Sequence, residues 1–237
     1  AVDWKRGTIW VGTGEVNSSR SSYAGIGILK SEDKGKTWQN MGLHDSHHIS
    51  RILINPSNPD EVIVGAVGHL YSKNEERGIY KTINGGKTWS KTLYIDDETG
   101  IIDVAVSPKN FKVRFAASWS KDRKAWDFIG SGATSGIYKS EDAGMTWKLF
   151  TNTESGFPVG EGVGRIGLAV YDDATVYAVL DNQFKRPLQS KKSNSLPIAF
   201  SMPGDEFLKL PNKSLNSILK NYKKTKKYRA ENIKHWV

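Results

Sequence analysis

Acidic residues that follow short apolar runs are the first candidates for chemistry. Glu15 comes directly after the run Thr8–Gly12, and Arg20 follows closely. A carboxylate held at a strand end can act as a general acid or base, and glycoside hydrolysis needs two such groups roughly 5 to 9.5 Å apart. We therefore take Glu15 and Asp127 as candidate catalytic residues, with Asp181 as a further acid. The structural alternative is that Glu15 pairs with Arg20 or caps a loop.

A dense imidazole cluster lies between two predicted strands, at His44, His47 and His48, with Asp45 beside it. Imidazole and carboxylate groups suit zinc and other transition metals. Adjacent strand residues point to opposite faces, however, so at most one of His47 and His48 can join His44. We therefore expect no metal site here, and we interpret these histidines as ligand contacts or loop hydrogen bonds.

A third group combines aromatic and basic residues in the segment 119–128, which contains Trp119, Arg123 and Trp126. Aromatic rings offer apolar faces to sugar C–H groups or to a peptide, and a guanidinium group binds polar substituents. The alternative is that Trp126 and Phe128 fold back to anchor the loop. In full, the candidate ligand-binding residues are Arg20, His44, His47, His48, Trp119, Arg123, Trp126 and Asp181.

An internal repeat indicates what must position these residues. The octapeptide 31–38, Ser-Glu-Asp-Lys-Gly-Lys-Thr-Trp, recurs at 82–89 and at 140–147. Its Ser and Asp side chains can accept hydrogen bonds from loop amides, and its Gly allows a positive φ, so each copy predicts a turn between two strands. The residues assigned this structural role are Ser31, Asp33, Gly35, Thr37, Trp38, Thr82, Asn84, Gly86, Thr88, Trp89, Ser140, Asp142, Gly144, Thr146 and Trp147.

Short β-branched and aromatic runs fill the sequence between the octapeptides and give four predicted strands per period of about 50 residues, which is typical of a β-propeller blade. The fold class is therefore all-β, with about three and a half four-stranded blades. No strand is expected before Thr8–Gly12. Because an unclosed stack leaves strand edges open to pairing, we expect the remaining blades to come from a longer chain or from another subunit.

The octapeptide resembles the Asp-box, or BNR, repeat, with the pattern Ser-x-Asp-x-Gly-x-Thr-Trp. Residues 8–181 are similar to bacterial BNR-repeat glycosyl hydrolase-like and sortilin-like propellers. The resemblance implies that the octapeptides are structural turns far from any ligand site, and that the protein is extracellular or periplasmic. In xyloglucanase-type relatives an Asp in the comparable first-blade region is catalytic, so Glu15 is a departure. A sialidase would need three arginines around a carboxylate; Arg20, Arg77, Arg123 and Arg165 are present, but the sialidase arginine motifs are not recognisable.

Charge divides the chain into residues 1–184, the propeller segment, and residues 185–237, a basic linker and short helical tail. From Lys185 onward there are 13 Lys and Arg against 3 Asp and Glu, whereas the rest carries 21 against 22. Because the tail offers few aromatic stacking platforms, we expect no nucleic-acid partner. One short helix is predicted after 212–214. The sequence has no run long enough for a membrane span, and the lack of cysteine excludes disulfides and thiolate chemistry.

Strand order predicts two faces. The octapeptide turns share one face, while the long loops and the connections between blades share the other, where a pocket near the axis is expected. The sequence therefore favours a propeller that binds a glycan or an extended peptide on its long-loop face, without a cofactor. Two alternatives stay open: a glycoside hydrolase whose site is completed by further blades, and an assembly or scaffold protein.

Overall fold

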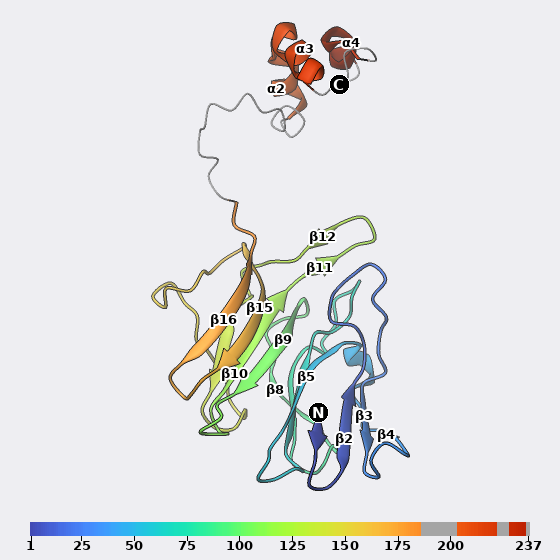
Figure 1. Ribbon diagram of the computed structural model, residues 1–237, viewed down its shortest axis with the longest axis vertical. Coiled ribbons are helices and arrows are strands. Elements are labelled where there is room, and N and C mark those ends of the chain that lie inside the picture. The colour runs from blue at the N-terminus through green and yellow to red at the C-terminus, as the bar shows by residue number, and fades with distance from the viewer. Residues whose placement is uncertain (186–202, 222–227, 236–237) are drawn as a thin grey trace. The chain divides into compact units, whose positions relative to one another are not determined.

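The computed structural model describes residues 1–185, 203–221 and 228–235. The chain forms two compact units, Ala1–Lys185 and Arg186–Val237. The first consists of antiparallel sheets and the second contains short helices (Figure 1). The predicted all-β class of the main unit is confirmed.

Three four-stranded antiparallel sheets, one long strand pair and one short hairpin build the first unit. The first sheet contains β1 (Val2–Asp3), β2 (Thr8–Gly12), β3 (Ile28–Ser31) and β4 (Gln39–Asn40), and the second contains β5 (Ile49–Ile54), β6 (Val62–Ala66), β7 (Gly78–Thr82) and β8 (Ser90–Leu93). The third sheet contains β9 (Thr99–Val106), β10 (Arg114–Ser120), β13 (Ile137–Ser140) and β14 (Lys148–Leu149), and the pair is β15 (Val163–Val170) with β16 (Val176–Asn182).

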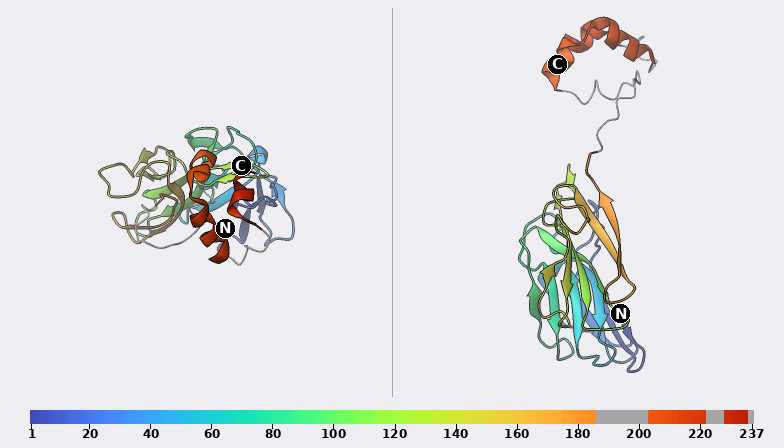
Figure 2. Two further views of the ribbon diagram at one scale, coloured as in Figure 1. Left: turned by 90° about the horizontal axis from the view of Figure 1, so that it is seen from above. Right: turned by 90° about the vertical axis from the view of Figure 1, so that its left-hand side faces the viewer.

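The sheets follow one another across the unit in chain order, from β1–β4 to β15–β16 (Figure 2). A small hairpin, β11 (Asp122–Arg123) with β12 (Phe128–Ile129), extends the third sheet's loop. A 3₁₀ turn, η1 (His44–Ser46), lies between the first two sheets. We call each sheet a blade.

The expectation that no strand precedes Thr8–Gly12 was wrong. Val2 pairs with Ile9 and Asp3 pairs with Thr8, so β1 is the first strand of the first blade. A two-residue strand is too short to show an alternating pattern, and only its pairing reveals it.

The tryptophans that end the octapeptides connect neighbouring blades. The Nε1–H of Trp89 donates to the Met41 carbonyl, 2.7 Å away, and the ring meets Trp10 edge to face. Trp147 Nε1 lies 3.3 Å from Thr92 Oγ1 of the preceding blade. Trp89 and Trp147 therefore both contact the blade that precedes their own. Trp38 bonds to the Gly35 carbonyl within its own turn and is 43% exposed.

Each octapeptide closes its turn with the same set of hydrogen bonds. In the third copy Asp142 accepts from the Ser140 hydroxyl, the Thr146 amide and the Thr146 hydroxyl, at 2.8, 2.9 and 2.5 Å. The Ser140 hydroxyl accepts from the Gly144 amide, and Gly144 has a φ of 78°. Asn84 replaces Asp in the second copy and still bonds to the Thr88 amide and hydroxyl. The turn therefore needs the side-chain geometry more than the charge.

This comparison predicts how the third turn responds to substitution. Burial opposes ionisation, but hydrogen bonds from Thr146 and Ser140 lower the pKa of Asp142 to about 2. We expect Asp142→Ala to lower the free energy of unfolding by roughly 1 kcal/mol, because four hydrogen bonds, including one from the Met145 amide, are lost at an exposed site. Asp142→Asn should cost less, as Asn84 shows. Urea denaturation at pH 7 measures both, and equal losses in the two variants would contradict this account.

Within its described residues the second unit has three helices, α2 (Gly204–Lys209), α3 (Asn212–Asn221) and α4 (Ala230–His235). Phe207, Leu215 and Ala230 are buried together and form its small core. The predicted helix corresponds to α3, whereas α2 and α4 were not predicted. The linker proposed over 185–203 and the lysines between α3 and α4 lie almost entirely outside the described residues. No helix in the described ranges has the length and apolarity of a membrane span.

Candidate ligand-binding groove and histidine cluster

The hydrogen bonds between turns define two faces of the β unit. On one face, the octapeptide turns meet the turns between the first two strands of each blade: the Gly85 amide donates to the Asp60 carbonyl, and the Ala143 amide donates to the Lys112 carbonyl. The longer loops and the connections between blades meet on the opposite face, which we call the loop face.

A groove on the loop face consists of two hollows, of about 400 and about 40 Å³, which share Glu98, Lys121 and Asp122. Five chain segments contribute to it, from the second blade, the third blade and the connection to β15. The larger hollow is lined by Asp96, Glu98, Ser120, Lys121, Asp122, Ile129, Ser131, Gly132, Ala133, Thr134 and Glu161. The smaller is lined by Leu70, Tyr71, Ser72, Lys73, Arg77, Glu98, Lys121, Asp122 and Lys124.

Lys121 lies at the junction of the two hollows and is 4% exposed. Its ammonium group donates to the carbonyls of His69 and Leu70, at 2.9 and 3.4 Å. Burial, followed by the charge of Arg77, lowers the pKa of Lys121 to about 7. The groove therefore has a buried amine next to its exposed carboxylates.

Arg77 holds the surrounding loops together from the inside. Its guanidinium group is 2% exposed and donates to the main-chain carbonyls of Val67, His69, Ser72 and Glu98, at 2.6 to 3.2 Å. These four bonds use its terminal nitrogens. Arg77 is therefore not free to clamp a ligand carboxylate, as a sialidase would require.

The histidine cluster forms around His47 and His69 rather than around His44. The rings of His47 and His69 stack with centroids 3.8 Å apart, and His69 Nε2 lies 3.1 Å from Asp45 Oδ1. His47 has a φ of 54°, an uncommon value for a non-glycine residue that directs its side chain toward His69. Burial lowers the pKa of His47, and the neighbouring His69 lowers it further. His44 is exposed and lies outside this cluster.

His48 points the other way, into the protein, and is 2% exposed. Burial, with the charge of Lys121, lowers its pKa to about 4. Neither of its ring nitrogens has a hydrogen-bond partner among the described residues. A side chain this deeply buried does not offer the surface contact for which it was proposed.

The predicted catalytic acids do not line the groove. Glu15 and Asp127 are exposed on separate loops, and Asp127 accepts a hydrogen bond from the Phe128 amide. Asp181 is exposed at the end of β16, where it accepts from the Gln183 side chain. Arg20 is exposed, and its carbonyl accepts from the Tyr71 hydroxyl.

The aromatic segment divides into an anchor and an exposed tip. Trp119 is 3% exposed, donates to the Gly130 carbonyl and meets Phe128 edge to face. Arg123 stacks on Phe128 and donates to the Ser18 carbonyl. Trp126 is 85% exposed at the tip of the β11–β12 hairpin. The loop anchor therefore consists of Trp119 and Phe128, and Trp126 is the ring that faces solvent.

Sequence reasoning missed the residues that meet in space. Lys121 follows β10 and Glu161 lies in the connection between β14 and β15, and no sequence pattern joins them before the chain folds. Asp45 was noted, but its partner His69 follows the next blade's second strand, about 24 residues away. The one feature of the sequence that could have indicated His69 is that it is a histidine in a loop expected on the same face as Asp45.

Comparison with solved structures finds partial matches at low sequence identity. An ancestral GH74 enzyme aligns with 72% of this chain at 19% identity and a TM-score of 0.46, and the GH74 xyloglucanase from Xanthomonas campestris aligns with 75% at 13% identity and 0.42. The complex described as YCF48 bound to a D1 peptide aligns with 76% at 13% identity and 0.31. The chain spans 21%, 26% and 59% of these structures, respectively.

No protein-family model matches the chain, and no curated protein sequence matches it. At these identities the structural likenesses concern the fold alone and carry no activity over to this chain. The all-β class rests on the antiparallel sheets themselves.

Proposed function

We propose that the loop-face groove binds a glycan, and that the chain is part of a ligand-binding propeller of the Asp-box type. The observation that carries this proposal is the groove itself, because four chain segments, from the third blade and from the connections before and after it, supply polar groups to one hollow of about 400 Å³. Sites that bind small ligands are concave and combine apolar surface with a few convergent polar groups.

The groove suits a hydroxyl-rich ligand in particular. Asp122 and Glu161 can accept from sugar hydroxyls, while the hydroxyls of Ser131 and Thr134 can donate or accept. Ile129 supplies apolar surface for a sugar C–H face. Among the described residues no hydrogen bond or ion pair occupies the carboxylate of Glu161, so it is the most available acceptor.

Binding is favoured over hydrolysis because the other groove acids have structural tasks. Asp96 accepts from the amides of Glu98 and Thr99, Glu98 pairs with Lys73 at 2.9 Å, and Asp122 pairs with Lys124 at 2.9 Å. A hydrolase needs one acid that donates a proton and a second that acts as base or nucleophile. Glu15 and Asp127 lie on other loops.

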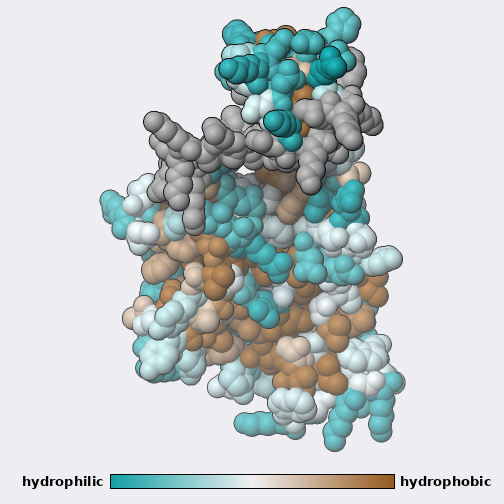
Figure 3. All heavy atoms as spheres, turned by 45° about the horizontal axis from the view of Figure 1, so that its top comes forward, coloured by the Kyte–Doolittle hydropathy of each residue, from teal (hydrophilic) through white to brown (hydrophobic). Residues whose placement is uncertain are grey.

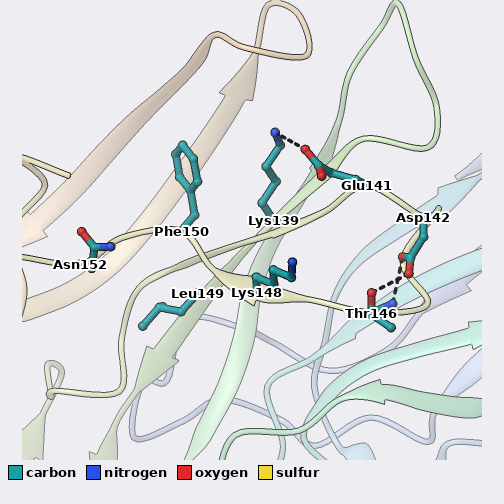
Figure 4. Close-up of a pocket in the computed structure, with 8 residues that line it drawn as sticks. All are labelled: Lys139, Glu141, Asp142, Thr146, Lys148, Leu149, Phe150 and Asn152. Carbon is teal, nitrogen blue, oxygen red and sulfur yellow. Dashed lines mark hydrogen bonds and ion pairs between the residues drawn. The ribbon is translucent and has the colours of Figure 1, made fainter. Parts of the chain in front are cut away.

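We also propose that further propeller strands, beyond β16, continue the row of blades. A lysine at the end of each third strand reaches the next blade's octapeptide turn: Lys30 donates to the Gly85 carbonyl and Lys81 to the Ala143 carbonyl, at 3.1 and 2.9 Å. The equivalent Lys139 instead bonds to the exposed Glu141 beside it. Figure 4 shows Lys139 and Phe150 at an open pocket of about 500 Å³, where a fourth octapeptide turn would fit.

The exposure of β16 supports the same proposal. Every residue of β6 is buried, and so are the first six of β10, whereas Tyr177 and Val179 of β16 are 65% and 79% exposed. No third strand pairs with β16 in the described part of the chain. Hydrophobic residues are visible over a broad area of the β unit (Figure 3). An unpaired, partly apolar strand edge of this kind favours pairing with a further strand.

A glycan array with the 237-residue chain tests the binding proposal. We expect saturable binding to at least one glycan class, and we expect Glu161→Gln to weaken it roughly tenfold, because a hydrogen bond to a charged acceptor is lost. Glu154→Gln is the matched control, since Glu154 is exposed in the same connection but lies outside the groove.

Three outcomes separate the candidate functions. Equal weakening by both glutamine variants, or no binding to any glycan, would overturn the proposal. Binding to extended peptides alone would indicate a peptide-binding propeller. Release of reducing sugar that Glu15→Gln abolishes would indicate a glycoside hydrolase instead.

A further inference from the structure

We propose that Asp45, His47 and His69 form a binding site for a divalent transition-metal ion, and that Zn²⁺ fits it best. One ligand atom from each of the three side chains lies within 4.8 Å of the other two. Two imidazole nitrogens and a carboxylate oxygen are a ligand set that zinc uses, with bonds of about 2.0 to 2.2 Å. The stacked rings of His47 and His69 must turn out of their parallel arrangement for both nitrogens to face one ion.

The two loops that carry the ligands are fixed to each other. Asn74 donates from Nδ2 to the Asp45 carbonyl at 3.1 Å, and its Oδ1 accepts from the His69 amide at 2.8 Å. The His69 carbonyl accepts from both Arg77 and Lys121. His69 is therefore held at both its amide and its carbonyl, and the ligands meet without a folding step upon binding.

The orientation of the His69 ring matches that of a metal ligand. Its Nδ1 lies 2.8 Å from the Ser72 hydroxyl, and its Nε2 faces Asp45 Oδ1. Without a metal ion, Nε2–H donates to Asp45, because a carboxylate only accepts. In the other tautomer Ser72 accepts from Nδ1–H, and the lone pair of Nε2 becomes available to an ion. Histidine ligands commonly have such an outer hydrogen bond, which sets the tautomer. His47 Nε2 lies on the same side, 3.6 Å from Asp45 Oδ1.

Exposure of the three side chains decides the kind of site. The Asp45 side chain is 64% exposed, His47 33% and His69 19%, so the cluster opens to solvent at the carboxylate. Three protein ligands with one open side resemble a zinc site that keeps a position for water or a ligand, unlike a closed structural site.

The site lies at the margin of the groove, because Leu70, Tyr71 and Ser72, which follow His69, line the smaller hollow. Metal binding nevertheless stands independently of the glycan proposal, since the three side chains and their supports are sufficient for it. The test therefore uses the metal alone.

Competition between the untagged 237-residue chain and a chromophoric chelator measures Zn²⁺ binding. We expect one equivalent to bind, and we expect Co²⁺ to give the visible absorption of a low-coordinate site. His69→Ala and Asp45→Asn should remove this binding. Ser72→Ala should weaken it roughly 10- to 100-fold, as the loss of an outer hydrogen bond does. The chain has no cysteine, so thiolates cannot compete.

His44→Ala is the matched control, because His44 belongs to the same turn as Asp45 and lies outside the cluster. It should bind Zn²⁺ as the unchanged chain does. Asp45→Asn alters an exposed side chain, so it tests the contribution of the cluster to Zn²⁺ binding even if His69→Ala does not fold. Absence of saturable binding by the unchanged chain would overturn the proposal. So would binding that persists in Asp45→Asn and His69→Ala but is lost in His44→Ala.

Discussion

Replacing Glu61 by alanine is expected to lower the free energy of unfolding of the β unit by about 3 to 5 kcal/mol. Glu61 Oε1 accepts from Arg114 at 2.8 Å and from Lys81 at 3.2 Å, and Oε2 accepts from Asn55 at 2.9 Å. The Arg114 side chain is only 1% exposed. Removal of Glu61 would therefore leave a buried guanidinium group without its counterion, which is the costly way to break a buried pair.

This network also joins two blades. Glu61 and Lys81 belong to the second blade, Arg114 belongs to β10 of the third, and Lys81 extends to the Ala143 carbonyl of the third octapeptide turn. Loss of the Glu61 carboxylate should therefore destabilise the contact between the second and third blades as well as the turn that carries Glu61. Urea denaturation followed by tryptophan fluorescence reports this unit, since seven of the eight tryptophans lie in residues 1–185.

The matched control is Glu141→Ala. Glu141 pairs with Lys139 at 2.7 Å, but its side chain is 73% exposed, so we expect a loss of less than about 1 kcal/mol. Similar losses in Glu61→Ala and Glu141→Ala would show that the buried network contributes no more than a surface ion pair.

Acid titration distinguishes the charge of Glu61 from its shape. Burial alone would raise the pKa of Glu61, but hydrogen bonds from Asn55, Arg114 and Lys81 outweigh it and lower the pKa. A lowered carboxyl pKa means that the stabilisation is complete above the ordinary glutamate pKa and is lost as the pH falls through the lower folded value. Glu61→Gln should therefore reduce the loss of stability in acid.

The repeated octapeptides made most of the fold predictable from sequence. Their hydrogen bonds are local, between residues two to four positions apart, so Ser140, Asp142 and Thr146 can be recognised without coordinates. The strands between the octapeptides can be recognised as well, because apolar and polar residues alternate along them or β-branched residues occur in runs, and both patterns involve neighbouring residues only. What escaped prediction was either too short for a period, such as β1, or isolated from any repeat, such as α2 and α4.

The candidate site was harder to predict because its chemistry depends on contacts between blades. Trp119 and Trp126 look alike in sequence, yet a hydrogen bond to the Gly130 carbonyl places the first in the core, and the second stays exposed. His47 and His48 are adjacent, and the backbone geometry at His47 sends their rings in different directions. We had expected this divergence from strand alternation, but His47 precedes β5 and its ring stacks on His69.

Arg77→Met is expected to lower the free energy of unfolding by about 3 to 5 kcal/mol, with the effect concentrated on the loop face. The guanidinium group satisfies four main-chain carbonyls in a region that water does not reach. Methionine fills a similar volume but donates nothing, so these carbonyls would be left without their donors. Arg77→Lys should be intermediate, because an ammonium group has three donors and cannot reproduce the planar fork.

Amide hydrogen exchange should locate the damage that Arg77→Met causes. We expect faster exchange at Val67–Ser72 and near Glu98, whose carbonyls Arg77 holds, and weaker Zn²⁺ binding because the His69 carbonyl is among them. Arg20→Met is the control, since Arg20 is exposed on the same face and should change stability by less than about 0.5 kcal/mol. If Arg77→Met matched this control in stability and in exchange, Arg77 would not organise the loop face. Its charge would then be free for a ligand, as a carboxylate clamp requires.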